Sequence, residues 1–147
     1  MKWLLDTNVV SESMRPRPNI NVKNWVEARE PELALSVVTL AELRDGASTL
    51  SDAARRDRLD RWISEIVIPR FDRRTFALTL EVLIEFIALA RQLGARGRPQ
   101  GAADLLIAAT ARTHGLDVVT RNVRGFANTG ITVYNPWTDE TQEMEAP

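Results

Sequence analysis

The 147-residue sequence contains no cysteine and a single histidine, His114. The lack of cysteine excludes disulfide bonds, thiolate metal sites and thiol nucleophiles. One histidine is too few for a two-histidine zinc site, and its position before Gly115 fits a helix C-terminus better than a general base. No apolar run approaches the roughly 20 residues that a membrane span needs, and Asp6 comes too early for a signal peptide. We therefore expect a soluble, cytoplasmic protein without a membrane segment.

Glycine-rich phosphate loops are missing as well. The patterns GxxxxGK[ST] and GxGxxG occur nowhere, so the sequence does not indicate a nucleotide-binding loop. Receiver domains and aspartyl-phosphate hydrolases place a lysine near the phosphate, but the only two lysines are Lys2, which precedes the first strand acid, and Lys23, far from any strand end. These phosphoryl chemistries are therefore disfavoured.

The composition indicates one globular domain, with 44% hydrophobic and 27% charged residues. The last ten residues hold four of the 20 acids and none of the 19 bases, which leaves a net charge of +3 on residues 1–137. We expect a single domain over residues 1–137 and an acidic, flexible tail over residues 138–147. Seventeen of the bases are arginines, whose planar guanidinium suits phosphate as well as carboxylate.

Short apolar runs separated by helical patterns indicate the fold class. They predict strands at residues 3–5, 32–36, 70–71, 117–120 and 131–134, with helices between them. The longest helix is expected over residues 74–95 and is apolar on two sides, so it is either central or shared with a partner. Alternating strands and helices favour an α/β fold, namely a three-layer α/β/α arrangement around a parallel five-stranded sheet.

Three acids occur where this sheet would bind a ligand. Asp6 ends the first strand, Glu42 lies on the helix after the second strand, and Asp104 interrupts the apolar face of the helix expected over 100–114. Each has a structural alternative. Asp6 can cap the following helix, although Thr7 could do so too, Glu42 can form a surface salt bridge, and Asp104 can stabilise a helix start.

The carboxyl ends of parallel strands share one edge of the sheet, so these acids are expected to converge. Three carboxylates repel one another unless cations lie between them. Oxygen ligands without histidine or cysteine favour Mg²⁺ or Mn²⁺. Such a cluster holds one or two ions that activate water and clamp a phosphodiester.

Four segments of the chain resemble the PIN-domain family, in particular its VapC/FitB-type toxins from prokaryotic toxin–antitoxin modules. They are LLDTNVVSE at 4–12, TLAELRDG at 39–46, AADLLIAATARTHGLDVVTRN at 102–122 and ITVYNPW at 131–137. The resemblance covers nearly the whole chain up to Trp137. It implies a metal-dependent endoribonuclease toxin with the same α/β fold as the one expected above.

The resemblance also implies roles for individual residues. The catalytic and metal-binding acids are Asp6, Glu42 and Asp104, with Mg²⁺ or Mn²⁺ as cofactor, and they have support from Thr7, Asn8, Thr120 and Asn122. The family often adds a fourth acid near the sequence TRN. Here those positions are Asn122 and Gly125, which leaves the number of ions open.

Partners follow from the charge pattern and the resemblance. Arg15, Arg17, Arg121 and Arg124 follow the first and fourth strands and are candidates for RNA phosphate contacts. The resemblance implies a homodimer and a small cognate antitoxin, in a hetero-oligomer that contacts DNA only through the antitoxin. Trp25, Trp62 and the helix expected over 74–95 are either partner surfaces or core.

Two rival functions remain at this point. A PIN-like protein that binds RNA or an antitoxin without cleaving would fit the missing fourth acid. A hydrolase of small phosphate esters could use a similar sheet and similar acids. Metal-dependent turnover of RNA separates the nuclease from the first, and activity on small esters would indicate the second.

Overall fold

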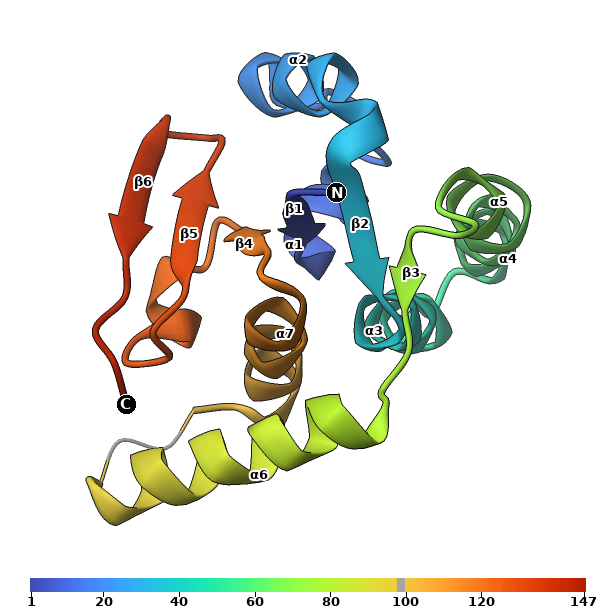
Figure 1. Cartoon of the computed structure of the whole chain (residues 1–147). Helices are drawn as coiled ribbons and strands as arrows, with labels where there is room; N and C mark the ends of the chain where they lie inside the picture. Colours follow the sequence, from blue (N-terminus) through green and yellow to red (C-terminus); the bar gives the residue numbers. More distant parts are fainter. Residues whose placement is uncertain (98–99) are drawn as a thin grey trace.

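The computed structural model describes residues 1–97 and 100–147, and it has a six-stranded sheet with helices on both sides (Figure 1). The strand order is β3-β2-β1-β4-β5-β6, and all neighbouring pairs are parallel except β5 and β6. The strands are β1 Trp3–Leu5, β2 Leu33–Ser36, β3 Thr75–Phe76, β4 Asp117–Val119, β5 Thr132–Asn135 and β6 Glu140–Glu143. The helices are α1 Thr7–Glu12, α2 Ile20–Ala28, α3 Val37–Ser48, α4 Ala53–Trp62, α5 Ile68–Arg70, α6 Leu80–Ala95 and α7 Ala102–His114, with the short helical segments η1 Glu30–Glu32, η2 Ile63–Val67 and η3 Val123–Phe126.

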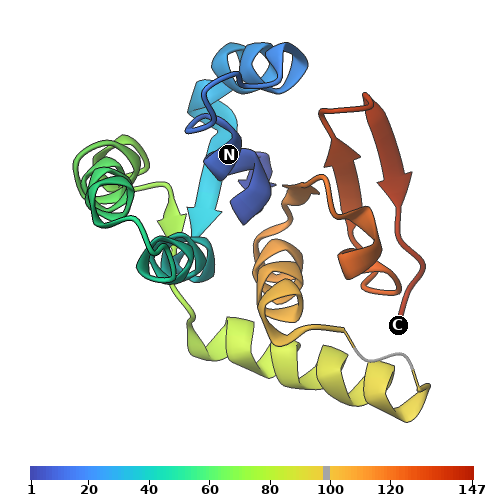
Figure 2. The ribbon, with the colours of Figure 1, turned by 180° about the vertical axis from the view of Figure 1, so that it is seen from behind.

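The inner strands bury both faces, because neighbouring side chains of a strand point to opposite sides of the sheet. In β1, Leu4 packs into the core cluster of α6 and α7, whereas Leu5 packs with α1 to α4. Val118 and Val119 of β4 divide in the same way. On the first side, α6 runs across the end of α7 (Figures 1 and 2). The expected three-layer α/β/α fold is therefore confirmed.

The strand order reverses between β1 and β4. From β1 the chain proceeds outward through β2 to β3, and it returns as β4 on the other side of β1. Open parallel sheets bind ligands at such a reversal, beyond the carboxyl ends of the strands. Asp6 follows β1 directly and Thr120 follows β4 directly, so both side chains start at this crevice.

The C-terminal segment differs from the flexible tail expected over residues 138–147. Its residues Glu140–Glu143 form β6, which pairs antiparallel with β5 at the edge of the sheet. Asp139 turns the chain with a φ of 58° and accepts a hydrogen bond from the Tyr134 hydroxyl at 2.8 Å. Met144 packs against the core. The sheet thus has the five expected parallel strands and one antiparallel strand more.

The third strand lies later in the chain than expected. The prediction at residues 70–71 is wrong, since helix α5 extends to this point and β3 is Thr75–Phe76. The helix expected over residues 74–95 accordingly begins only at Leu80. A strand of two residues shows no alternation of its own, and its apolar residue continues the helical spacing of α6.

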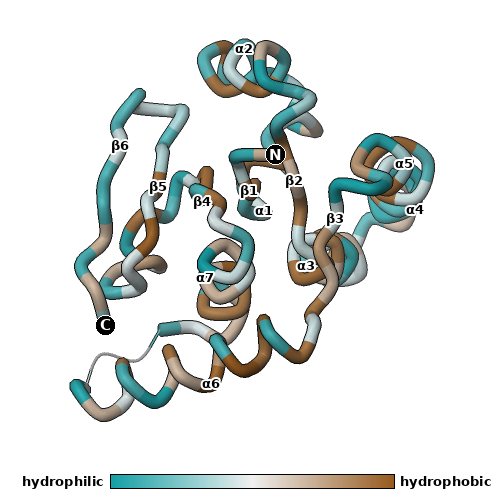
Figure 3. Tube along the Cα trace, viewed as in Figure 1, coloured by the Kyte–Doolittle hydropathy of each residue, from teal (hydrophilic) through white to brown (hydrophobic). Residues whose placement is uncertain are grey.

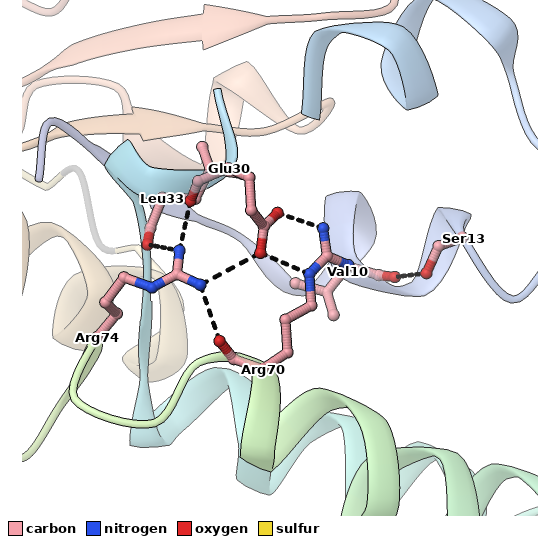
Figure 4. Close-up of polar contacts among 6 residues, drawn as sticks. All are labelled: Val10, Ser13, Glu30, Leu33, Arg70 and Arg74. Atoms are coloured by element: carbon pink, nitrogen blue, oxygen red, sulfur yellow. Dashed lines mark hydrogen bonds and ion pairs between the residues drawn. The ribbon is translucent and has the colours of Figure 1, made fainter. Parts of the chain in front are cut away.

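An ionic cluster joins the segment before β2 to the segment before β3 (Figure 4). The Glu30 carboxylate accepts hydrogen bonds from Arg70 Nε at 2.7 Å and from Arg74 Nη2 at 3.2 Å. Arg74 Nη1 also donates to the Leu33 carbonyl at 2.9 Å. The hydrogen bond from Arg70 is the largest cause that holds the pKa of Glu30 below its usual range. The cluster fixes β3 beside β2.

Helix α6 is apolar on two sides, as expected. One side packs into the core through Val82, Leu89 and Leu93. The start of α6 is brown in Figure 3, and Leu80 and Ile84 on the other side are more than half exposed. Within residues 1–97 and 100–147, no helix is long and apolar enough to cross a membrane.

Candidate active site at the carboxyl edge of the sheet

Asp6 is both a helix cap and a buried carboxylate. Its Oδ1 accepts a hydrogen bond from the Thr7 backbone N–H at 2.8 Å, which starts α1. Its side chain is almost fully buried, and burial raises its pKa more than its three hydrogen bonds lower it. Asp6 therefore does cap α1, as the structural alternative predicted. A cap needs one oxygen, however, and Oδ2 is held by other groups.

Thr120 and Asn8 hold that second oxygen. The Thr120 hydroxyl donates to Asp6 Oδ2 at 2.7 Å and accepts hydrogen bonds from Asn8 Nδ2 and from the Asn122 N–H, both at 3.0 Å. Asn8 Nδ2 also lies 3.3 Å from Asp6 Oδ2, and Asn8 Oδ1 accepts from the Arg121 N–H at 3.0 Å. The Thr120 hydroxyl thus uses its one donor and both acceptors, which fixes the orientation of the Asp6 carboxylate.

Glu42 is connected to the same region through Thr7. It lies in the second turn of α3, whose N-cap is Ser36. The Thr7 hydroxyl donates to Glu42 Oε1 at 2.6 Å. Glu42 forms no ion pair within the described chain, since Arg44 donates instead to the Ser64 hydroxyl at 3.0 Å. The salt-bridge alternative for Glu42 is therefore absent from this structure.

Asp104 lies in the first turn of α7, a helix whose N-cap Gly101 contributes no side-chain hydrogen bond. Burial and then the negative charges of Asp6 and Glu42 raise the pKa of Asp104 to about 6. Within residues 1–97 and 100–147, its carboxylate has neither a hydrogen bond nor an ion pair. The helix dipole favours an acid here, but it does not remove the repulsion from the other two carboxylates. The three acids are electrostatically coupled.

The donors at this edge fit a hard divalent cation. They are carboxylate, hydroxyl and amide oxygens, without sulfur or imidazole. A cation between the acids would relieve the repulsion that raises the pKa of Asp104. As the side chains stand, no group of three acidic or histidine side chains in the described chain is close enough to hold an ion.

Gly125 leaves room for the Asp104 carboxylate. A Cβ at Gly125 would lie 2.5 Å from Asp104 Oδ2 and 2.8 Å from Asn122 Nδ2. An acid at position 125 would therefore displace Asp104, whereas Asn122 already has its side chain beside it. Of the two positions considered for a fourth acid, only 122 can carry a side chain without disturbing Asp104.

A groove of about 870 Å³ opens beside Thr7 and Glu42. Of the four arginines expected to contact RNA, Arg15 and Arg121 line this groove, and Arg17 and Arg124 do not. Arg15 forms an ion pair with Glu12, in which Arg15 Nη1 lies 3.5 Å from Glu12 Oε2.

Three other residues that line this groove could not be predicted from the sequence. Arg55 and Arg58 enter it from α4, and Trp137 enters it from the segment after β5. The two arginines are spaced by three residues and precede an apolar residue on the same helix face, which is a weak signal available from the sequence. Nothing in the sequence shows that this face of α4 shares a groove with Glu42.

Residues 3–131, most of the chain, match the PIN domain family. The chain belongs to this family. The match runs from the start of β1 to the residue before β5, and it therefore includes all three acids at the carboxyl edge of this PIN domain.

Two curated relatives and one solved structure are similar over almost their whole length. Toxin FitB of Neisseria gonorrhoeae is 36% identical over 92% of this chain and 99% of its own length. The VapC ribonuclease Y4jK of Sinorhizobium fredii is 36% identical over 91% of this chain and 96% of its own length. The structure of FitAB bound to an IR36 DNA fragment aligns with a TM-score of 0.83 and 33% identity, over 92% of this chain and 95% of that chain. The resemblance to VapC/FitB-type PIN proteins is thus confirmed.

Proposed function

We propose that this PIN domain is a ribonuclease toxin, which hydrolyses RNA phosphodiester bonds with Mg²⁺ or Mn²⁺ and is neutralised by a cognate antitoxin. One relative is named a toxin and another a ribonuclease, each at 36% identity. The observation that carries the proposal is the coupling of Asp6, Glu42 and Asp104 at the strand-order reversal, where the pKa of Asp104 is raised to about 6. Uncompensated carboxylates at a ligand-binding edge are typical of a cation site.

Asp6 and Asp104 would hold the cation, and Glu42 would complete the site or orient water. When bound, a divalent cation would act as a Lewis acid that activates water and stabilises charge on the phosphate. Thr120 and Asn8 orient the Asp6 carboxylate through hydrogen bonds of 2.7 and 3.3 Å. Hydrolysis breaks the bond between phosphorus and the 3′ oxygen, which leaves a 5′-phosphate and a 3′-hydroxyl.

The proposed antitoxin would bind beside the acids. A cavity of about 250 Å³ is lined by apolar residues of α1, α2 and η2, and it shares Glu12 and Trp62 with the larger groove beside Thr7 and Glu42. This position lets one partner cover the cavity with an apolar helix and place a basic side chain near the acids. Trp25 is instead core, since it is 8% exposed and stacks on Tyr134 at 5.0 Å.

We further propose that the exposed side of α6 forms a homodimer. Leu80, Ile84 and Ile87 are 75, 59 and 54% exposed, which is a large apolar area to leave in water. DNA would be contacted through the antitoxin only, and the protein would act in the cytoplasm.

The test is cleavage of total cellular RNA by antitoxin-free protein, with Mg²⁺ or Mn²⁺ and with EDTA. Asp6→Asn and Asp104→Asn remove the proposed ligands, and Asp45→Asn is a matched control on an exposed position of α3. We expect discrete cuts that need the cation, persist in the control and vanish in both site variants. Cuts that survive both site substitutions would indicate a contaminant.

A second candidate is a PIN domain that binds RNA or antitoxin without turnover. The observation in its favour is that Asn122 and Gly125 occupy the positions of a fourth acid. Folded, antitoxin-free protein that never cleaves would support it. Asn122→Asp is then the substitution to restore activity, because Asn122 already has a side chain of this size beside Asp104, whereas a side chain at Gly125 would displace Asp104.

A further inference from the structure

Glu12 is a buried acid at the end of α1. Its side chain is only 7% exposed, and it lines both the cavity beside α2 and the groove beside Glu42. As the last residue of α1, it faces the negative end of the helix dipole. A buried charge at such a position is unfavourable unless another group compensates it. The negative charge of Glu12 therefore calls for a partner.

Within residues 1–97 and 100–147, two groups form polar contacts with this carboxylate. Oε1 accepts a hydrogen bond from the Asn19 N–H at 3.1 Å, at the N-cap of α2. Oε2 lies 3.5 Å from Arg15 Nη1. A glutamine at position 12 could accept the Asn19 hydrogen bond through its carbonyl oxygen, so this bond does not require a charge. The ion pair with Arg15 is the contact that does.

Arg15 lies in the same groove as Glu42. It follows α1 by three residues, and Thr7, at the start of α1, also lines the groove and donates to Glu42 Oε1 at 2.6 Å. From Thr7 to Glu12 the helix rises about 8 Å, a distance that a long, flexible arginine side chain can largely span. The Arg15 side chain is 61% exposed, and the Glu12 carboxylate is the group that holds it.

The three acids at the carboxyl edge have no positive partner within the described chain. Neither Asp6 nor Glu42 nor Asp104 forms an ion pair there. The negative charges of Asp6 and Glu42 add to burial in raising the pKa of Asp104. An unrestrained guanidinium in the groove would be attracted to Glu42 and would compete there with any divalent cation.

We propose that Glu12 is a positioning residue, which holds the Arg15 guanidinium away from Glu42 and so leaves the three acids open to a divalent cation. This inference rests on the proposed cation-dependent function. Glu12 acts through Arg15 and does not itself contact the cation. The alternative is that Glu12 only joins α1 to α2 through its hydrogen bond with Asn19.

The test is calorimetric titration of the whole chain with Mn²⁺. Glu12→Gln keeps an acceptor for the Asn19 N–H but removes the charge that holds Arg15. We expect Mn²⁺ to bind this variant about tenfold more weakly, because a guanidinium beside a carboxylate stabilises the charged form by a factor of this order. Adding Arg15→Gln to Glu12→Gln should restore the affinity to within about twofold of the original.

A second variant separates the contact with Arg15 from the net charge. Glu12→Asp keeps the negative charge, but its side chain is one carbon shorter and cannot reach Arg15 as before. It should also weaken Mn²⁺ binding, and Arg15→Gln should again restore it. Glu65→Gln is the matched control, since Glu65 is an exposed acid of η2 that lines neither the cavity nor the groove. We expect the control to change the affinity less than about twofold.

Three results would overturn the inference. They are Mn²⁺ binding to Glu12→Gln as tight as to the original, a weakening by Glu12→Gln without one by Glu12→Asp, and no recovery when Arg15→Gln is added. The last result would assign the loss to the connection between α1 and α2.

The outcome is distinguishable from that of the proposed function. Mn²⁺ binding that depends on Glu12 and Arg15 as expected, without RNA cleavage, would support this inference and refute the nuclease. Cation-dependent cleavage together with Mn²⁺ binding that is indifferent to Glu12 would do the reverse. An original chain that binds no Mn²⁺ would refute both.

Discussion

Replacing Gly125 by alanine should remove activity while leaving the fold intact. The added Cβ would lie 2.5 Å from Asp104 Oδ2, 2.8 Å from Asn122 Nδ2 and 3.1 Å from Asp104 Cγ. Ordinary contact begins near 3.4 Å, so the Asp104 carboxylate must move by about 0.9 Å. The crowded atoms belong to two short side chains at the proposed cation site, and not to the backbone.

The expected magnitudes differ for stability and for activity. The backbone of Gly125 is not in the left-handed region, so alanine would gain roughly 0.4–1 kcal/mol from a less flexible unfolded chain. Rotating Asp104 out of its position costs about 0.5–1.5 kcal/mol. The two effects nearly cancel, and we expect the free energy of unfolding to change by less than about 1 kcal/mol. A shift of this size in a cation ligand should lower the cleavage rate about 100-fold.

The assay pairs RNA cleavage in Mg²⁺ with thermal unfolding of the same preparations. Gly94→Ala on α6 is the control, because nothing lies within 4 Å of its added Cβ. Calorimetric titration with Mn²⁺ should show weaker binding to Gly125→Ala than to the control. A Gly125→Ala protein that cleaves and binds Mn²⁺ as the original does would refute the placement of Asp104 in the site.

Other substitutions and pH changes test the surrounding contacts. Thr120→Val should raise the pKa of Asp6 further and reduce RNA cleavage at least about tenfold, because valine lacks the hydroxyl that is hydrogen-bonded to Asp6. Thr120→Ser keeps a hydroxyl and should retain most of the cleavage activity. In EDTA, the contribution of Asp104 to the free energy of unfolding should fall by about 1 kcal/mol as pH rises from about 4 to about 6, because its folded-state pKa is raised to about 6 and solvent screens part of the effect at this half-buried group. The fall should appear as the difference between the original chain and Asp104→Asn in urea titrations. Glu30→Gln should cost about 1 kcal/mol at pH 7 in the same titrations, because Arg70 lowers the pKa of Glu30 in the fold. The loss should shrink as pH falls below the unfolded-state pKa of Glu30 and vanish below its lower folded-state pKa.

The sequence was sufficient for the parts of the fold that have a strong local pattern. β1 and β4 are short apolar runs that end in polar residues, and Asp6 and Thr120 follow from them without further information. The crossover rule for parallel strands then brings Asp104 to the same edge, since α7 precedes β4 and starts where the strands end. These predictions depend on topology and not on side-chain packing.

The predictions were wrong for the segments of the chain that have no such pattern. Proline is expected to end a helix, yet the helical path continues past Pro69. The reason is that η2 changes the hydrogen-bond register before the proline, since the Ile68 N–H donates to the Ile63 carbonyl. β6 has no buried residue, so its composition resembles that of a disordered tail. It is held by backbone pairing with β5 and by a hydrogen bond of 2.8 Å from the Met144 N–H to the Ile131 carbonyl.

The contribution of α4 could not be inferred from its composition, since it carries four arginines that look alike in the sequence. The packing of α4 against the core distinguishes these arginines from one another. Leu59 and Trp62 turn one face of the helix inward, so that Arg55 and Arg58, on that same face, meet the groove. Arg61 remains exposed on another face. The difference between an arginine that lines the groove and one that does not therefore lies in the apolar residues at the other end of the helix, which pack against the core. If the groove binds RNA as the proposed function requires, a change at Leu59 should alter this binding without removing any charge.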